Sequence, residues 1–204
     1  MNQLLLPLPR HNAQLQQVSV LMLDLVGSTR LARDLPLEQY AALMTELVQL
    51  LILSCEALGG TVLQHLGDGV VACWPEEQTP QAVRCSLEAP LRVARLTLAE
   101  QLGVKLQVRG GVANGTVMMG ELSSQLTAYG LPLNLARRMC DSARPDETLV
   151  CADVAQWCLN AQAPVTFDFD LRDDLPCFRG FGVDCLSYTA RQRGVSHRNQ
   201  MKAI

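Results

Sequence analysis

The most constraining feature of the sequence is a short, mostly apolar run that ends in an acidic residue. Residues 17–24, QVSVLMLD, are apolar at most positions up to Asp24. A run of this kind is typical of a buried strand, which needs other elements packed against its sheet. Gly27, Ser28 and Thr29 then favour the start of a helix directly after the strand. The run therefore predicts a buried strand that delivers a carboxylate to the edge of a sheet.

The rest of the chain continues this alternation of strands and helices. Apolar residues at helical spacing predict a helix over 37–57, which Gly59 ends. An Asp-Gly turn between two apolar runs predicts a hairpin of strands 61–66 and 70–74, with Asp68 at its tip. The other expected elements are a helix over 79–102 with a break or kink at Pro90, strands 106–113, 115–121 and 125–129, a helix over 132–142, a strand 147–150, a helix 151–160, and strands 164–169 and 183–190.

Length, charge and cysteine pattern exclude several classes of function. The 204 residues suffice for one substantial core, and the net charge of −3 argues against binding to nucleic acid or to an anionic membrane. No apolar run is long enough to span a bilayer, and the N-terminus does not resemble a signal peptide, so we expect a cytoplasmic protein. The eight cysteines form no CxxC pair and are expected to be reduced core residues. A P-loop is excluded because no GxxxxGK[ST] string is present.

Two acidic residues at strand ends form the first possible site. Asp24 and Asp68 lie 44 residues apart, yet each follows a predicted strand or turn at a sheet edge. Paired carboxylates suit Mg²⁺, which prefers hard oxygen ligands and often joins one or two carboxylates to substrate phosphates. The alternative is structural, because an Asp-Gly pair makes a good turn whether or not a metal binds.

A second possible site lies on the helix that follows Gly130. Asn134 and Arg138 are four residues apart, so both side chains project from one face, whereas Arg137 is expected to point elsewhere. An Arg can bind phosphate oxygens with its fork of donors, and an Asn can hydrogen-bond a ribose. An exposed amphipathic helix with a solvated Arg is the alternative interpretation.

Five segments, in order, resemble motifs of the class III nucleotidyl cyclase catalytic domain, the adenylate and guanylate cyclase family. The resemblance implies a ferredoxin-like α/β fold (an α+β sandwich) with a mixed, mostly antiparallel sheet and helices packed on it. It covers a catalytic domain over 16–190, between an N-terminal arm 1–15 and a C-terminal tail 191–204. The five segments are VSVLMLDLVGSTRL, GGTVLQHLGDGVVACW, VRGGVANGTVMMGEL, TAYGLPLNLARRM and, more weakly, FRGFGVDCLSYTA.

The resemblance assigns roles to individual residues. Asp24 and Asp68, helped by the backbone carbonyl of Leu25, become ligands of two Mg²⁺ or Mn²⁺ ions per site. Asn134 and Arg138 become the transition-state pair. By the resemblance, Arg179 replaces the family's triphosphate-binding lysine, on a looser alignment than the other residues.

The residues that would bind the base depart from the family pattern. Gln64 stands where adenylate cyclases of the family usually carry a Lys, while Thr127 fits the partner position. A Gln amide both donates and accepts, so it can pair with adenine, guanine or a pyrimidine, and ATP is the leading substrate only by resemblance. His65 is expected to face the opposite side of the sheet from Gln64.

The resemblance implies an enzyme that converts a nucleoside triphosphate to a 3′,5′-cyclic nucleotide and pyrophosphate. It also implies a homodimer in which the metal-binding acids of one protomer meet the Asn and Arg of the other. Because the cyclase segment fills nearly the whole chain, we expect a free-standing enzyme. Two alternatives remain open. One is a catalytically silent nucleotide-binding or dimerisation module derived from a cyclase, and the other is an unrelated ferredoxin-like interaction domain.

Overall fold

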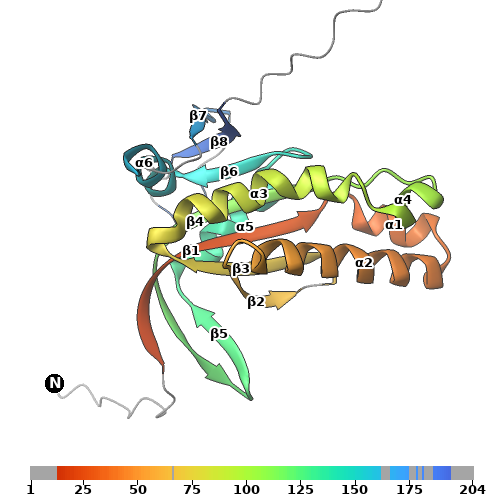
Figure 1. Cartoon of the computed structure of the whole chain (residues 1–204), viewed down its shortest axis with the longest axis horizontal. Helices are drawn as coiled ribbons and strands as arrows, with labels where there is room; N and C mark the ends of the chain where they lie inside the picture. Colours follow the sequence, from red (N-terminus) through yellow and green to blue (C-terminus); the bar gives the residue numbers. More distant parts are fainter. Residues whose placement is uncertain are drawn as a thin grey trace, which may run out of the picture.

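A single mixed sheet forms the centre of the molecule (Figure 1). The computed structural model describes residues 13–65, 67–161, 166–174, 178, 181 and 186–193. Among them, eight strands form the sheet in the order β2-β3-β1-β4-β6-β8-β7, and β5 pairs with β4 outside that path. The strands are β1 (Gln14–Leu25), β2 (Thr61–His65), β3 (Gly69–Pro75), β4 (Val108–Leu122), β5 (Gln125–Tyr129), β6 (Thr148–Cys151), β7 (Phe167–Leu171) and β8 (Ser187–Gln192).

The pairing confirms the mixed, mostly antiparallel sheet that the resemblance implies. β4 and β6 run parallel, and the other paired strands are antiparallel. The predicted buried strand is β1, which lies between β3 and β4. Its residues from Val18 to Leu23 are all buried, as expected for a strand covered on both faces.

Helices cover both faces of the sheet. They are α1 (Ser28–Asp34), α2 (Leu37–Glu56), α3 (Thr79–Val93), α4 (Thr97–Gln101), α5 (Leu131–Ser142) and α6 (Ala152–Asn160), with a 3₁₀ turn, η1, at Glu76–Gln78. In Figure 1, α2 and α3 lie side by side across one face, and α5 lies behind β1 and β4. Two neighbouring glycines of β4 face the helices on opposite sides of the sheet. A Cβ on Gly110 would meet Ser86 of α3, and one on Gly111 would meet the backbone of α5.

The strands expected at 106–113 and 115–121 are in fact one strand, β4, and that part of the prediction was wrong. β4 pairs with β1 without interruption across Asn114 and Gly115, which face Ser19 and Val18. Glycine is common in turns, but the glycines of β4 instead permit close approach of other elements. A Cβ on Gly115 would lie 2.9 Å from Cγ of Pro132, at the start of α5. A local sequence pattern cannot distinguish these two uses of glycine.

The helix expected over 79–102 is divided, but not at Pro90. Pro90 lies inside α3, which ends three residues later at Val93. The backbone then becomes extended at Leu96. A short second helix, α4, then completes the segment. The other helices and strands fall within a few residues of their predicted bounds, except that residues 164–165 and 183–185, where the last two strands were expected to begin, lie outside the described residues.

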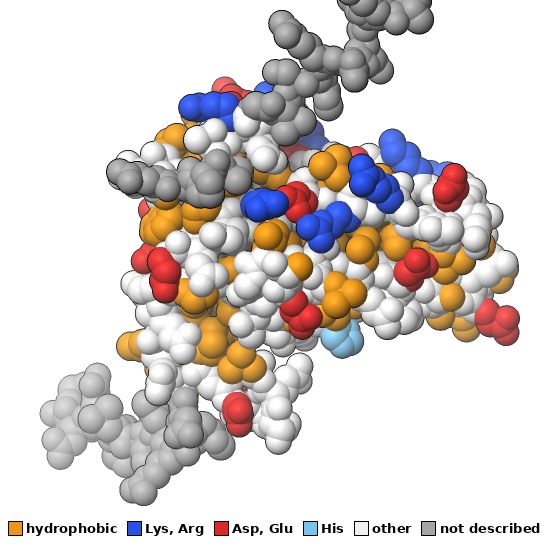
Figure 2. Space-filling view, viewed as in Figure 1, with side chains coloured by type: hydrophobic (Ala, Val, Ile, Leu, Met, Phe, Trp, Pro, Cys, Tyr) orange, Lys and Arg blue, Asp and Glu red, His pale blue; other side chains and the backbone are white. Residues whose placement is uncertain are grey.

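The cysteines and the charged surface residues can be compared with what the sequence predicted. Six described cysteines are free and buried, while the remaining two, Cys177 and Cys185, lie outside the described residues. On the face of α2 and α3, acidic and basic side chains are interspersed (Figure 2). On α3, Glu88 forms ion pairs with Arg84 and Arg92. No helix within the described residues is long and apolar enough to cross a bilayer.

Candidate active site

Asp24 and Asp68 come together at one edge of the sheet because of strand register. Asp24 pairs with Gly69 of β3 on one side and with Arg109 of β4 on the other. The backbone N–H of Leu25 donates to the carbonyl of Asp68 at 3.1 Å, which fixes the tip of the β2–β3 hairpin beside the end of β1. A Cβ on Gly69 would lie 2.5 Å from the carbonyl oxygen of Leu23, so only glycine fits beside the acid. The predicted pair of carboxylates is therefore adjacent in space.

Arg109 holds the Asp24 carboxylate. Its Nη2 and Nε donate to Oδ2 of Asp24 at 2.8 and 3.2 Å, and its Nη1 donates to the carbonyl of Asp141 at 2.6 Å. Burial raises the pKa of Asp24, the Arg109 hydrogen bond opposes that rise, and the nearby Asp68 charge adds to it. Arg109 was not predicted from the sequence. Its pairing opposite Asp24 becomes visible only when the register of β1 and β4 is known.

The charge at this edge fits a divalent cation. A carboxylate with a raised pKa beside a second carboxylate is a place where a cation would relieve both burial and repulsion. No cluster of three or more His, Cys, Asp or Glu occurs within the described residues, so the pair available there is Asp24 and Asp68. Two carboxylates suffice for Mg²⁺ or Mn²⁺ when substrate phosphates and water complete the ligand set.

A separate cavity of about 330 Å³ brings together three of the predicted nucleotide-binding residues. Gln64 comes from β2, Thr127 from β5 and Asn134 from the first turn of α5. Gln125 and Arg137 add polar groups. Its apolar walls are Met22, Leu63, Val71, Leu126, Ala128 and Leu133. A cavity with apolar walls and a few polar groups suits a flat heterocycle with a polar edge.

The position of Arg137 was predicted wrongly. Arg137 lines the cavity with Asn134, whereas Arg138 is not among the lining residues. The reason is helix geometry, because residues three apart are neighbours on a helix surface just as residues four apart are. Both arginines are exposed on α5.

The remaining predicted residues lie as follows. Leu25 follows Asp24 directly, and His65 lies next to Gln64 on β2 but does not line the cavity. Arg179 lies outside the described residues. Neither Asp24 nor Asp68 lines the cavity, so within one protomer the carboxylates and the Gln64 cavity are two separate sites.

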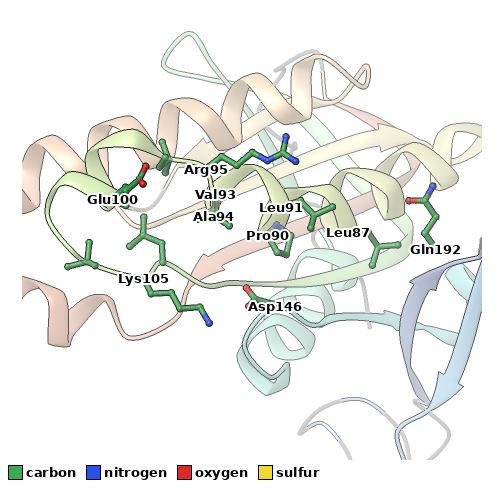
Figure 3. A pocket seen from close by; sticks show the side chains of 14 residues that line it. Leu87, Pro90, Leu91, Val93, Ala94, Arg95, Glu100, Lys105, Asp146 and Gln192 are labelled. Atoms are coloured by element: carbon green, nitrogen blue, oxygen red, sulfur yellow. The ribbon is translucent and has the colours of Figure 1, made fainter. Parts of the chain in front are cut away.

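A larger cavity, of about 930 Å³, lies away from both of these sites. It is bounded by α3, α4 and the segment that leads into β4 (Figure 3). Its lining is mostly aliphatic, with Arg95, Glu100, Lys105, Asp146 and Gln192 as its polar members. Size alone would make it the first choice for a ligand site. It contains none of the predicted residues, and the paired acids that phosphoryl chemistry requires lie elsewhere.

Comparison with known proteins identifies the family. The family model of the adenylate and guanylate cyclase catalytic domain matches residues 11–181. The chain belongs to this family. Among curated relatives of the cyclase domain, adenylate cyclase 1 of Rhizobium meliloti is 27% identical over 135 residues, which are 61% of this chain and 20% of that protein. An uncharacterised protein of Mycobacterium tuberculosis is 30% identical over 166 residues, 74% of this chain and 40% of that protein. The chain thus spans less than half the length of these relatives.

Solved cyclase structures share the fold. The adenylyl cyclase CyaB from P. aeruginosa superposes with a TM-score of 0.78 at 18% identity, covering 93% of this chain and 99% of that one. The guanylate cyclase domain of RhGC from Catenaria anguillulae, solved in complex with GTP, has a TM-score of 0.75 at 18% identity and covers 89% of this chain and all of that one. The expected cyclase fold is confirmed by these likenesses.

Proposed function

We propose that this cyclase domain converts a purine nucleoside triphosphate to its 3′,5′-cyclic monophosphate and pyrophosphate, in a homodimer with shared active sites. The observation that carries the proposal is the division of each protomer into two incomplete sites. Asp24 and Asp68 form one, and the cavity of Gln64, Thr127 and Asn134 forms the other. A second copy that placed its carboxylates at the mouth of this cavity would complete both sites.

Exposed apolar side chains support the dimer. Four large ones are between 53% and 69% exposed: Leu15 on β1, Leu122 and Tyr129 on the β4–β5 hairpin, and Leu131 at the start of α5. In Figure 1 this hairpin extends away from the body of the protein. Apolar side chains gathered on a projecting element are typical of a surface that another chain covers.

The chemistry follows from the residues that each half supplies. Asp24 and Asp68 would hold two Mg²⁺ or Mn²⁺ ions, which neutralise triphosphate charge and favour loss of the ribose 3′-hydroxyl proton. Arg109 positions the Asp24 carboxylate, and its hydrogen bond partly offsets the rise in the pKa of Asp24 that burial causes. Gln64 and Thr127 bind the edge of the base, and Asn134 orients the ribose. Arg138 stabilises charge on the α-phosphoryl oxygens while pyrophosphate leaves.

The test is a product assay. The full chain is incubated with ATP, GTP, CTP or UTP and Mn²⁺, and products are identified by mass spectrometry. We expect a cyclic monophosphate and pyrophosphate that disappear in Asp68→Ala. Mn²⁺-dependent nucleotide binding without any product would instead support the catalytically silent module.

A further inference from the structure

Arg137 is the one charged residue among the described residues that line the 330 Å³ cavity. The other polar groups there, on Gln64, Gln125, Thr127 and Asn134, are neutral. Within the described part of the chain, Arg137 makes no ion pair. Its guanidinium is therefore available to a ligand in the cavity.

The neutral groups of the cavity do not distinguish adenine from guanine. The amides of Gln64 and Gln125 each carry donors and an acceptor, so they can present either to a base. The hydroxyl of Thr127 donates to the backbone carbonyl of Gln125 at 3.3 Å, which leaves its oxygen as an acceptor. Both purines offer a donor to such an acceptor, from the exocyclic amine of adenine or from the ring N–H and amine of guanine.

A guanidinium does distinguish them. It carries only donors, in a fixed planar fork. Guanine presents two neighbouring acceptors, O6 and N7, and Arg pairs with both. Adenine presents N7 beside an amino group at N6, so the same fork would meet a second donor and leave hydrogen bonds unmade.

From this chemistry we propose that Arg137 is a base-recognising residue and makes GTP the preferred substrate. The inference rests on the proposed function, since it takes the cavity as the place where the purine binds. It also replaces the expectation of ATP, which rested on the family resemblance alone. Arg138, one position further along α5, keeps the phosphate role.

The experiment compares GTP with ATP in the full chain with Mn²⁺. Nucleotide binding is followed by thermal stabilisation, and turnover by kcat/KM. We expect the wild-type protein to favour GTP roughly tenfold to a hundredfold, the range of one good bidentate base contact. Arg137→Ala should remove most of this preference by weakening GTP. Arg137→Gln should likewise lose most of the preference for GTP, because a Gln amide can present a donor or an acceptor to either purine.

Two control variants separate base recognition from general effects. Arg191→Ala removes an exposed arginine on β8 and should leave the ratio of GTP to ATP unchanged. Arg138→Ala should lower turnover of both nucleotides alike. An equal loss of GTP and ATP in Arg137→Ala, or a wild-type preference for ATP, would overturn the inference.

Binding and turnover also separate this inference from the proposed function. Selective GTP binding that depends on Arg137, without product, would support the inference and contradict the enzyme. Product formation with no role for Arg137 in base choice would support the enzyme and contradict the inference. Failure to bind either nucleotide would overturn both.

Discussion

Asp68 contributes its carboxylate to the proposed metal site, and its backbone carbonyl holds the β2–β3 turn beside the end of β1. Its carbonyl accepts from the N–H of Leu25, and this bond does not depend on the carboxylate. Asp68→Asn should therefore keep the fold while removing one of the two negative charges available to a cation. We expect Mn²⁺-dependent stabilisation to disappear and cyclic nucleotide formation to fall at least about a hundredfold, in the range of losing a main transition-state stabiliser. Asp34→Asn, an exposed change on α1, is the matched control. A full Mn²⁺ response in Asp68→Asn would contradict the metal role.

Gly111 is required by the close approach of α5 to β4. A Cβ there would lie 2.1 Å from the carbonyl oxygen of Ala136 and 2.5 Å from the backbone N of Cys140. Backbone atoms cannot relieve such a clash by rotating, as the end of a flexible side chain can. We expect Gly111→Ala to lower the free energy of unfolding by about 3 kcal/mol, as overpacking in a core does. Gly103→Ala is the control, since its Cβ would meet nothing and only the positive φ of 66° opposes it. That change should cost about 1 kcal/mol. Equal losses in urea denaturation would argue against the close approach.

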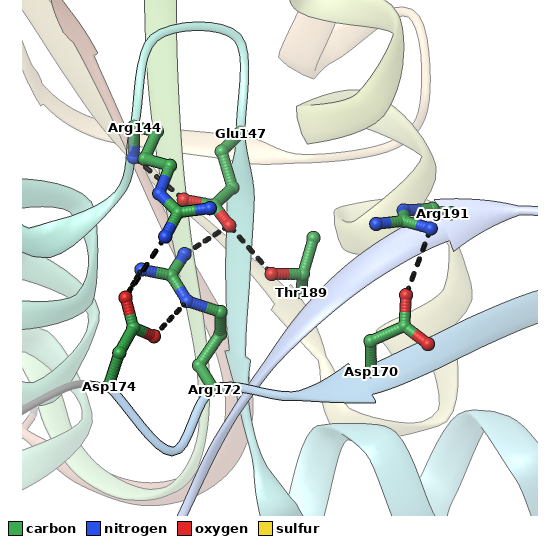
Figure 4. A network of polar contacts seen from close by, with 7 residues as sticks. All are labelled: Arg144, Glu147, Asp170, Arg172, Asp174, Thr189 and Arg191. Carbon is green, nitrogen blue, oxygen red and sulfur yellow. Dashed lines mark hydrogen bonds and ion pairs between the residues drawn. The ribbon is translucent and has the colours of Figure 1, made fainter.

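At the scale of elements, a polar network joins β6 to β7 and β8 (Figure 4). Arg172 follows β7 and forms ion pairs with Glu147 and Asp174. Glu147 also accepts from Thr189 of β8 at 2.6 Å and from the backbone N–H of Arg144 at 2.7 Å. The side chains of Arg172 and Glu147 are 9% and 10% exposed, so solvent screens this pair little. The network therefore ties the last strands of the sheet to the strand that runs beside β4.

The network makes stability depend on pH. Burial tends to raise the pKa of Glu147, but the hydrogen bonds from Arg172, the Arg144 backbone and Thr189 outweigh it, so the pKa lies below its usual value of 4.5. A lowered folded pKa means that the ionised pair stabilises the fold above pH 4.5 and that this contribution is lost as pH falls through the folded value. Glu147→Gln should lower the free energy of unfolding by about 3 kcal/mol at pH 7, because Arg172 loses its buried partner.

The pH dependence itself supplies the test for Glu147. Urea denaturation at pH 7, 5 and 3.5 should show the gap between wild type and Glu147→Gln narrowing at the lowest pH. Glu77→Gln, on the exposed 3₁₀ turn, should show almost no gap at any pH. A gap for Glu147→Gln that stays constant with pH would mean that packing, rather than charge, supplies the stability.

Elements whose signals are local were predicted from the sequence, and elements set by distant contacts were not. The apolar run of β1 and the Asp-Gly turn before β3 act within a few residues, so both were placed closely. The glycines of β4 pack against α3 and α5, which lie far away in the sequence. A local pattern therefore could not show that the two strands expected within 106–121 are one strand. Arg109 was missed for a related reason, because its pairing with Asp24 depends on the register between β1 and β4.

The sequence also could not show which face of α5 points toward the cavity. Spacing predicted that Asn134 and Arg138 share a face, but spacing of three serves as well as spacing of four. Only the direction from which α5 packs against β4 and β1 decides which arginine lines the cavity, and the structure places Arg137 there. Sequence spacing could thus define a pair of possible residues without choosing between them.

At the scale of the whole molecule, the two halves of the proposed active site lie apart within one protomer. Asp24 lies near the end of β1 and Asp68 at the tip of the β2–β3 hairpin, and neither lines the cavity that Gln64 and Asn134 share. If the halves meet only across a dimer, then a defect in one half can be compensated by a subunit that is intact in that half. Subunit mixing therefore tests the architecture independently of any single residue.

Asp24→Ala removes a carboxylate from one half, and Arg138→Ala removes a cation from the other, so each protein alone should be inactive. When the two are unfolded, mixed in equal amounts and refolded together, half of the dimers should contain one copy of each. Each of these heterodimers would hold one intact composite site, so activity should return to about a quarter of the wild-type value per protomer. Mixing Asp24→Ala with Asp68→Ala supplies the control, because both defects lie in the same half and no intact site can form. No recovery in the first mixture, despite heterodimers seen by native mass spectrometry, would show that each protomer works with its own residues. Recovery in the control would show that Asp24 and Asp68 of one site come from different protomers.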